Sequence, residues 1–216
     1  MKRREFSAAA GTVLGAAGLG VPGLVLAQRR PQDGKDFREL DRKAAVEAAP
    51  GRIEVVEFFW YSCPHCNAFE PKLNAWLRNV PADVSFRRVP VAFRDDFVPQ
   101  QRLFYTLEAM GKLDEMHSKV FQEIHVHKQP TNRAESILAF VEKNGLDRAR
   151  FTELYNSADV SGKARRAAQL QDMYQVDGVP AMGVAGRYYT DATMAGTMDR
   201  CLQIVDYLVG EVRRAK

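Results

Sequence analysis

The 216-residue sequence is poor in residues that bind metals, with three cysteines, four histidines and a single Cys-x-x-Cys pair. A structural zinc site needs four ligands, and no second cysteine pair exists to supply them. His117, His125 and His127 could complete such a site with the one pair, but its sequence context does not match the usual zinc spacings. We therefore expect no bound metal.

A strong charge of one sign is also missing. The formal net charge is +4 at pH 7, and the Lys-Arg-Arg-Glu stretch at residues 2–5 contributes half of it. In the rest of the chain, acids and bases are interleaved. This balance gives no reason to expect a nucleic-acid or anionic-membrane partner. Repeats are absent too, so one domain with a sizeable core, able to hold an insertion, is the default.

Residues 1–27 have the pattern of an export signal peptide. Lys2-Arg3-Arg4 forms a charged start, Ala8 to Val25 is apolar, and small residues ending at Ala27 permit cleavage before Gln28. Glycines and a proline in the apolar part argue against a permanent membrane anchor. The Arg-Arg-Glu-Phe stretch at residues 3–6 resembles the twin-arginine export motif, but the serine after it departs from that motif. The export route therefore stays open.

The most informative stretch is Cys63-Pro64-His65-Cys66, which follows an apolar run and precedes a helical pattern. A Cys-x-x-Cys at a strand-to-helix junction places both sulfurs on the first turn, close enough to form a disulfide. A helix N-terminus stabilises a thiolate and lowers its pKa, a protonated His65 adds to this effect, and Pro64 suits the first helical position. We predict a redox pair in which Cys63 is the exposed, attacked sulfur and Cys66 the buried, resolving one.

The order of elements predicts an α/β fold. After an arm with a short edge strand near 37–40, residues 53–59 form a nearly continuous apolar run, typical of a strand covered on both faces. An amphipathic helix over 67–79, interrupted by Pro71, and a parallel strand over 84–91 complete a βαβ unit. Residues 28–96 are thus the first part of the domain.

Residues 97–176 have helical periodicity throughout, so we expect an inserted helical domain. Gly111 and Gly145 are expected C-caps, and Asp147 an N-cap. Residues 177–216 return to strand, with a turn at Gly178 and Pro180, a hairpin, and a final amphipathic helix. That span is the second part of the α/β domain.

Five side chains outside the motif attract attention. Glu57 interrupts the buried strand, so its pKa is expected to be raised. It is either a proton donor and acceptor for Cys66, or a carboxylate that is paired with a lysine or solvated. Cys201, on the apolar stripe of the last helix, is expected to be a buried, inert thiol, with an intermolecular disulfide as the alternative. Tyr61 is expected at the rim, while His125 and His127 are expected at the surface or a helix end.

The combination of Val56-Glu57-Phe58-Phe59, Cys63-Pro64-His65-Cys66, a helical insertion and Gly178-Val179-Pro180 resembles the DsbA family of periplasmic thiol:disulfide oxidoreductases. The resemblance implies a thioredoxin fold with an inserted helical domain. It also implies a cis Val179-Pro180 bond facing the disulfide, with the Val179 backbone pairing with an extended substrate, and it makes Glu57 the buried acid of the site.

The same resemblance implies a function. The protein would be a monomeric, periplasmic dithiol oxidase that gives its Cys63–Cys66 disulfide to exported proteins with reduced cysteines. It would need no other cofactor, and a quinone-linked membrane oxidase resembling DsbB would reoxidise it. The alternatives are a disulfide isomerase, for which residues 28–50 are too short a dimerisation domain, a reductase serving cytochrome c maturation, or a non-redox chaperone or assembly module.

Overall fold

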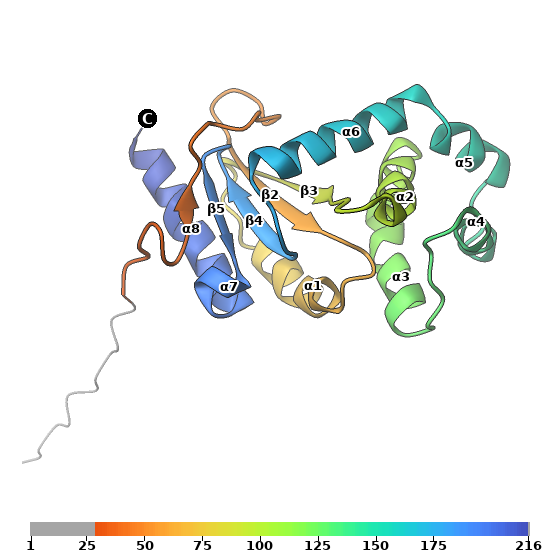
Figure 1. Ribbon diagram of the computed structural model, residues 1–216, viewed down its shortest axis with the longest axis horizontal. Helices are drawn as coiled ribbons and strands as arrows, with labels where there is room; N and C mark the ends of the chain where they lie inside the picture. Colours follow the sequence, from red (N-terminus) through yellow and green to blue (C-terminus); the bar gives the residue numbers. More distant parts are fainter. Residues whose placement is uncertain (1–28, 216) are drawn as a thin grey trace, which may run out of the picture. The chain divides into compact units, whose positions relative to one another are not determined.

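The computed structural model describes residues 29–215. The predicted signal peptide lies outside the described residues. A five-stranded sheet has the order β1-β5-β4-β2-β3, and its central strand is β2 (Ile53–Phe59) (Figure 1). On one side β2 pairs in parallel with β3 (Val84–Pro90), and on the other it pairs antiparallel with β4 (Ala181–Val184). Every residue of β2 is buried, as its continuous apolar run predicts.

Two strands complete the sheet. β5 (Tyr188–Asp191) forms an antiparallel hairpin with β4, and β1 (Arg38–Glu39) pairs with β5 at the edge. β1 lies within the edge strand predicted near 37–40, and β4 and β5 form the predicted hairpin. The turn between β4 and β5 includes Gly186, whose φ of +66° places it in the left-handed region.

Side chains of β2 alternate between two hydrophobic clusters, one on each face of the sheet. Ile53 and Val55 pack with α1 (Pro64–Leu77) and α8 (Met198–Arg214), whereas Val56 and Phe58 pack with the helical segment. Helix α1 begins at Pro64, as the suitability of proline for the first helical position predicted, with Cys63 as its N-cap residue, so it starts three residues before the amphipathic pattern over 67–79. The helix continues past Pro71.

Between β3 and β4 the described chain is helical, as predicted. The segment begins with a short 3-10 turn, η1 (Asp95–Phe97), and its helices are α2 (Val98–Ala109), α3 (Leu113–His125), α4 (Ala134–Lys143), α5 (Arg148–Tyr155) and α6 (Ala158–Met173). Gly111 and Gly145 have positive φ after α2 and α4, and the Asp147 side chain accepts a hydrogen bond from the Arg150 N–H at the start of α5. Short α7 (Ala192–Ala195) was not anticipated from the sequence.

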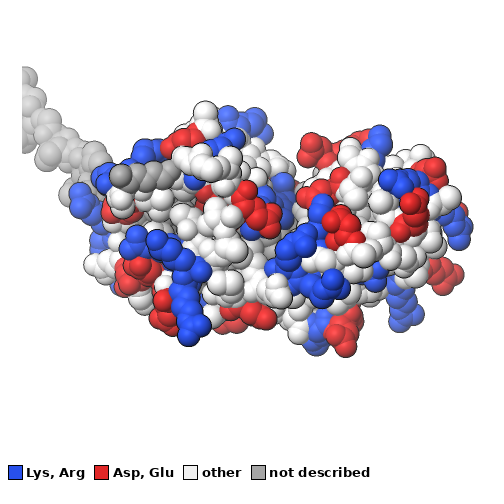
Figure 2. Space-filling model, turned by 90° about the horizontal axis from the view of Figure 1, so that it is seen from above, with Lys and Arg blue, Asp and Glu red and all other residues white. Residues whose placement is uncertain are grey.

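This architecture is a thioredoxin fold with an inserted helical segment, which extends the molecule to one side of the sheet (Figure 1). On the face seen in Figure 2, positive and negative side chains are interspersed over both the sheet and the helical segment. No helix within residues 29–215 combines the length and apolar character needed to cross a membrane.

Candidate active site

The Cys63-Pro64-His65-Cys66 stretch lies where β2 gives way to α1. Cys63 is the N-cap residue, and its N–H donates to the Trp60 carbonyl at 3.0 Å, which closes the loop between strand and helix. Cys66 lies in the first turn. Both sulfurs are free thiols in this structure. Pro64 and His65 are exposed at the helix start, so the motif has one open side and one buried side.

The Cys63 sulfur is set up to be a thiolate. Its pKa is lowered to about 6, first by a hydrogen bond from the Cys66 thiol and further by the backbone N–H groups of Cys66 and His65 and by the His65 charge, against the opposing effect of burial. Only 7% of the residue is exposed, which corrects the expectation of an open sulfur. The loop at Val179 covers it, with the Val179 carbonyl oxygen 3.4 Å from Sγ.

Cys66 has the opposite environment. It is fully buried, and its pKa is raised well above the ordinary value by burial, by the hydrogen bond to Cys63 and by the charges of Cys63 and Glu57. A hydrogen bond from the Trp60 backbone partly opposes that rise. The two sulfurs of one motif therefore differ in protonation at neutral pH, with Cys63 ionised and Cys66 held as a thiol.

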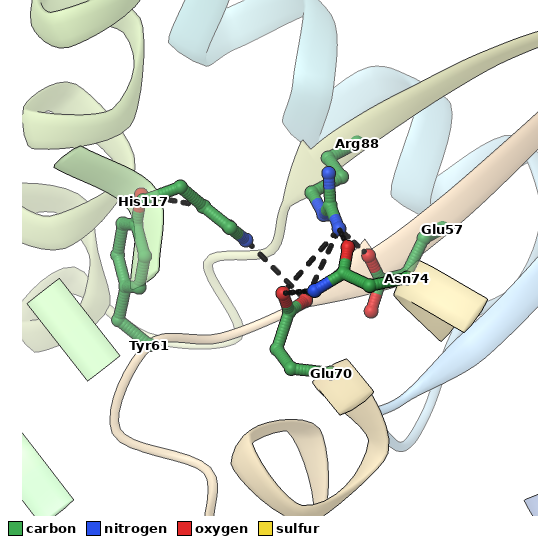
Figure 3. Close-up of polar contacts among 6 residues, drawn as sticks. All are labelled: Glu57, Tyr61, Glu70, Asn74, Arg88 and His117. Atoms are coloured by element: carbon green, nitrogen blue, oxygen red, sulfur yellow. Dashed lines mark hydrogen bonds and ion pairs between the residues drawn. The ribbon is translucent and has the colours of Figure 1, made fainter. Parts of the chain in front are cut away.

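Glu57 is fully buried in β2 and pairs with Arg88, its register neighbour on β3, at 3.0 Å between Oε2 and Nε (Figure 3). Burial raises its pKa to about 8, although the Arg88 charge acts in the opposite direction. The raised pKa was expected, but the partner is an arginine and not a lysine, and the carboxylate is not solvated. An acid that changes protonation near neutral pH can exchange a proton with a neighbouring thiol.

Two residues that sequence reasoning missed extend this polar cluster (Figure 3). Glu70, one turn after Cys66 on α1, pairs with Arg88 at 3.3 Å and accepts a hydrogen bond from His117 Nε2 at 3.3 Å. Burial would raise the pKa of Glu70, but that pKa is lowered because the hydrogen bond from His117 and the Arg88 charge outweigh the burial. The spacing from Cys66 to Glu70 places both on one helix face and could have pointed to Glu70, but no local signal identifies His117 on α3.

Tyr61 contradicts its predicted place at the rim. It is 1% exposed, and its hydroxyl lies 2.9 Å from His117 Nδ1. Helix α3 covers the tyrosine, and this long-range contact has no signature near residue 61. His125 is the last residue of α3, as its helix-end prediction required, and His127 is exposed beyond it.

The Val179-Pro180 peptide bond is cis, as the resemblance implied, and faces Cys63. Beside it lies a groove of about 620 Å³ whose lining includes His65, Phe69, Lys72, Pro180 and Met198. The groove runs from the start of α1 to the start of α8. It leaves room for an extended chain beside the Val179–Pro180 loop.

The third cysteine, Cys201, is not part of the redox pair. Cys201 is fully buried on α8, and burial raises its pKa to about 12, in keeping with an inert thiol. Within residues 29–215 no three His, Cys, Asp or Glu side chains come together in a way that could hold a metal ion.

Comparison with known proteins agrees with this geometry. The DSBA-like thioredoxin domain family matches residues 82–206. The chain is 38% identical over 186 residues to the thiol:disulfide interchange protein DsbA of Burkholderia cepacia, covering 86% of this chain and 88% of that protein. It is 39% identical over 209 residues to the protein of the same name from Azotobacter vinelandii, covering 95% of this chain and 97% of that protein.

A solved structure, that of Pseudomonas aeruginosa DsbA, superposes with a TM-score of 0.80 at 40% identity, covering 84% of this chain and 94% of that one. The likeness thus extends over sheet, redox motif and helical segment together. On these grounds the chain belongs to the DsbA-like thioredoxin family and is a thiol:disulfide oxidoreductase.

Proposed function

We propose that Cys63 and Cys66 are the redox pair with which this protein oxidises cysteine pairs of exported proteins. The observation that carries the proposal is the contrast between the two sulfurs: the pKa of Cys63 is lowered to about 6, whereas Cys66 is fully buried and its pKa is raised. A stabilised Cys63 thiolate favours the reduced protein, so the disulfide is readily given up to other thiols.

The reaction proceeds in two exchanges. A substrate thiolate attacks the Cys63 sulfur and forms a mixed disulfide. The Cys63–Cys66 bond breaks, and Cys66 leaves with the electron pair as a thiolate. Glu57, whose pKa of about 8 keeps it protonated at neutral pH, supplies the proton that Cys66 takes up. The second substrate thiolate then attacks the substrate's own sulfur in the mixed disulfide, which releases Cys63 as a thiolate and leaves the substrate oxidised.

The substrate segment binds in extended form along the Val179–Pro180 loop. The Val179 carbonyl faces the Cys63 sulfur at 3.4 Å, so a chain that pairs with this backbone brings its own cysteine to the attacked sulfur. Main-chain pairing accepts many sequences, and the neighbouring groove gives room for side chains on either side of that cysteine. Together these features suit a broad range of substrates.

The proposal also covers how the protein is reoxidised and where it acts. The reduced protein passes two electrons to a quinone-linked membrane oxidase resembling DsbB and acts as a monomer without a bound cofactor. The export pattern of residues 1–27 supports a periplasmic location, with cleavage near Ala27 by either the general or the twin-arginine route. In that compartment newly formed disulfides persist.

The test is the equilibrium of the protein with reduced and oxidised glutathione, together with oxidation of a reduced, unfolded substrate protein. We expect a strongly oxidising equilibrium, loss of activity in Cys63→Ser, and full activity in the matched control Cys201→Ala. A reducing equilibrium would reverse the direction of electron flow and favour the reductase. Retained activity in Cys63→Ser would instead favour a non-redox chaperone.

A further inference from the structure

Side chains on one face of helix α3 contact Tyr61, which lies in the loop between β2 and the redox motif. His117, Phe121 and His125 are spaced four residues apart, so they share one face of the helix. His117 Nδ1 lies 2.9 Å from the Tyr61 hydroxyl, and His125 Nε2 donates to the Tyr61 carbonyl oxygen at 2.8 Å. Between them the Phe121 ring meets the Tyr61 ring edge to face at 5.1 Å. We call this set of contacts the Tyr61 clamp.

The direction of the hydrogen bonds follows from the charges around His117. Its pKa is lowered by burial, so the ring is neutral at neutral pH, and Glu70 is an ionised acceptor. The Nε2–H therefore donates to Glu70, which leaves Nδ1 to accept from the Tyr61 hydroxyl. His117 thus joins the loop that precedes the redox motif to the helix turn that follows it (Figure 3).

Tyr61 follows Trp60, a residue whose backbone interacts with both cysteines of the motif. The Trp60 carbonyl accepts the Cys63 N–H at 3.0 Å. A hydrogen bond from the Trp60 backbone also opposes the rise in the pKa of the Cys66 thiol. Ser62, which follows Tyr61, exchanges hydrogen bonds with Gln100 of α2. The three loop residues between β2 and the motif are therefore fixed largely by the helical segment.

We propose that the Tyr61 clamp positions the Trp60 N–H against the Cys66 sulfur, which makes His117 and His125 positioning residues of the disulfide exchange. When a thiolate attacks Cys63 and the Cys63–Cys66 bond breaks, the electron pair goes to Cys66 in a site without water contact. A fixed backbone N–H stabilises that developing charge as a preorganised donor. A better stabilised leaving thiolate departs faster, so the clamp speeds the first exchange.

The proposal rests on Cys63 and Cys66 being the redox pair, and the experiment keeps the two ideas apart. The oxidised protein is reduced by glutathione in stopped flow, as wild type and as Tyr61→Phe, His125→Ala, His125→Gln and His127→Ala. Tyr61→Phe removes only the hydroxyl, and His125→Gln keeps a donor that can reach the carbonyl. His127→Ala is the matched control, since this exposed histidine lies two residues further on, with no side-chain contact to Tyr61 among the described residues.

We expect Tyr61→Phe and His125→Ala to slow reduction by about three- to tenfold, the equivalent of one hydrogen bond, with His125→Gln near the wild-type rate and His127→Ala unchanged. The titration of the Cys63 thiol should stay the same, because the groups that stabilise its thiolate, the Cys66 thiol and the N–H groups of Cys66 and His65, all belong to α1. A general loosening of the fold would shift that titration and the thermal midpoint together.

Rates of His125→Ala and Tyr61→Phe equal to that of His127→Ala would overturn the clamp, as would a Cys63 titration that shifts along with the rate. Equal slowing in His125→Gln and His125→Ala would likewise show that the donor is not what matters. If wild-type protein is not reduced at Cys63–Cys66 at all, the redox pair itself is wrong and the clamp falls with it.

Discussion

At the scale of single residues, the site depends on unequal burial of similar groups. Cys63 keeps a 7% exposed fraction at the start of α1, whereas Cys66 and Glu57 keep none. Burial raises the pKa of both hidden groups, while the helix start and the neighbouring thiol lower that of Cys63. In the reduced protein the pKa of Glu57 is about 8. The Glu57 carboxylate can therefore also act as a base for the Cys66 thiol when the disulfide re-forms.

That role predicts a pH profile. When reduced protein reacts with oxidised glutathione, Cys66 must lose its proton before it attacks the mixed disulfide on Cys63. Glu57 is ionised only above about pH 8, so this step should accelerate as the pH rises through that value. In Glu57→Gln we expect a step slower by about one to two orders of magnitude and no inflection near pH 8. Stopped-flow kinetics against pH, with exposed Glu135→Gln as control, would reject the role if both variants behaved alike.

His65 predicts a smaller effect on Cys63. Its charge is the weakest of the causes that lower the Cys63 pKa, behind the Cys66 thiol and the two backbone N–H groups. We expect His65→Ala to raise the Cys63 pKa by a fraction of a unit and to make the protein less oxidising against glutathione. Thiolate absorbance measured against pH gives the pKa directly. Identical titration curves in the two proteins would show that the imidazole charge does not reach the sulfur.

The sequence identifies residues whose role follows from local pattern and misses those held by distant contacts. Glu57 stands out because a carboxylate in a buried strand is costly, and Cys63 and Cys66 because of their spacing. Tyr61 could not be placed, because its polar end meets His117, which lies 56 residues further along the chain. The same reason hid His125, whose partner is the Tyr61 carbonyl.

At the scale of elements, prediction succeeds where a signal is strong and local. The continuous apolar run of β2 and the glycines that end α2 and α4 gave those elements their places. The start of α1 at Pro64 follows from the local Cys63-Pro64 junction, although the amphipathic pattern is regular only from residue 67. Short α7 has one turn and too few residues to show a helical period.

One packing contact between elements is tight enough to test. A Cβ on Gly183 in β4 would stand 2.4 Å from the ring of Tyr174, which is fully buried against Phe58. We expect Gly183→Ala to lower the free energy of unfolding by about 1–3 kcal/mol, because the ring has no room to move aside. Urea denaturation measures the loss.

Gly162→Ala is the matched control for that substitution. Its Cβ would approach only flexible arginine side chains, those of Arg166 at 3.4 Å and Arg165 at 3.9 Å, and alanine favours a helix. We expect it to leave stability unchanged or to raise it. If both alanines had the same effect, the contact with Tyr174 would not be the limiting one.

At the scale of the whole molecule, the chemistry of one sulfur is linked to stability. In the reduced protein, folding lowers the Cys63 pKa from 9.0 to about 6. Folding is therefore favoured where the thiolate forms: the gain is complete above about pH 9 and is lost as the pH falls through about 6. The oxidised protein has no such thiol and serves as its own control.

We thus expect reduced protein to gain stability over oxidised protein as the pH rises from about 6 to 9. Thermal midpoints of both forms, taken across this range, check the prediction. Parallel curves for the two forms would mean that the Cys63 thiolate is no better stabilised in the folded state than in the unfolded chain.

The strand order also sets the timing of folding. The ribosome makes β2 early, but one of its two neighbours, β4, begins only at Ala181. Until then one edge of the central strand has no partner, and its amide groups are open to other chains. The nascent chain therefore cannot finish its sheet until β4 has been made, and products that stop before Ala181 are expected to aggregate or to be degraded.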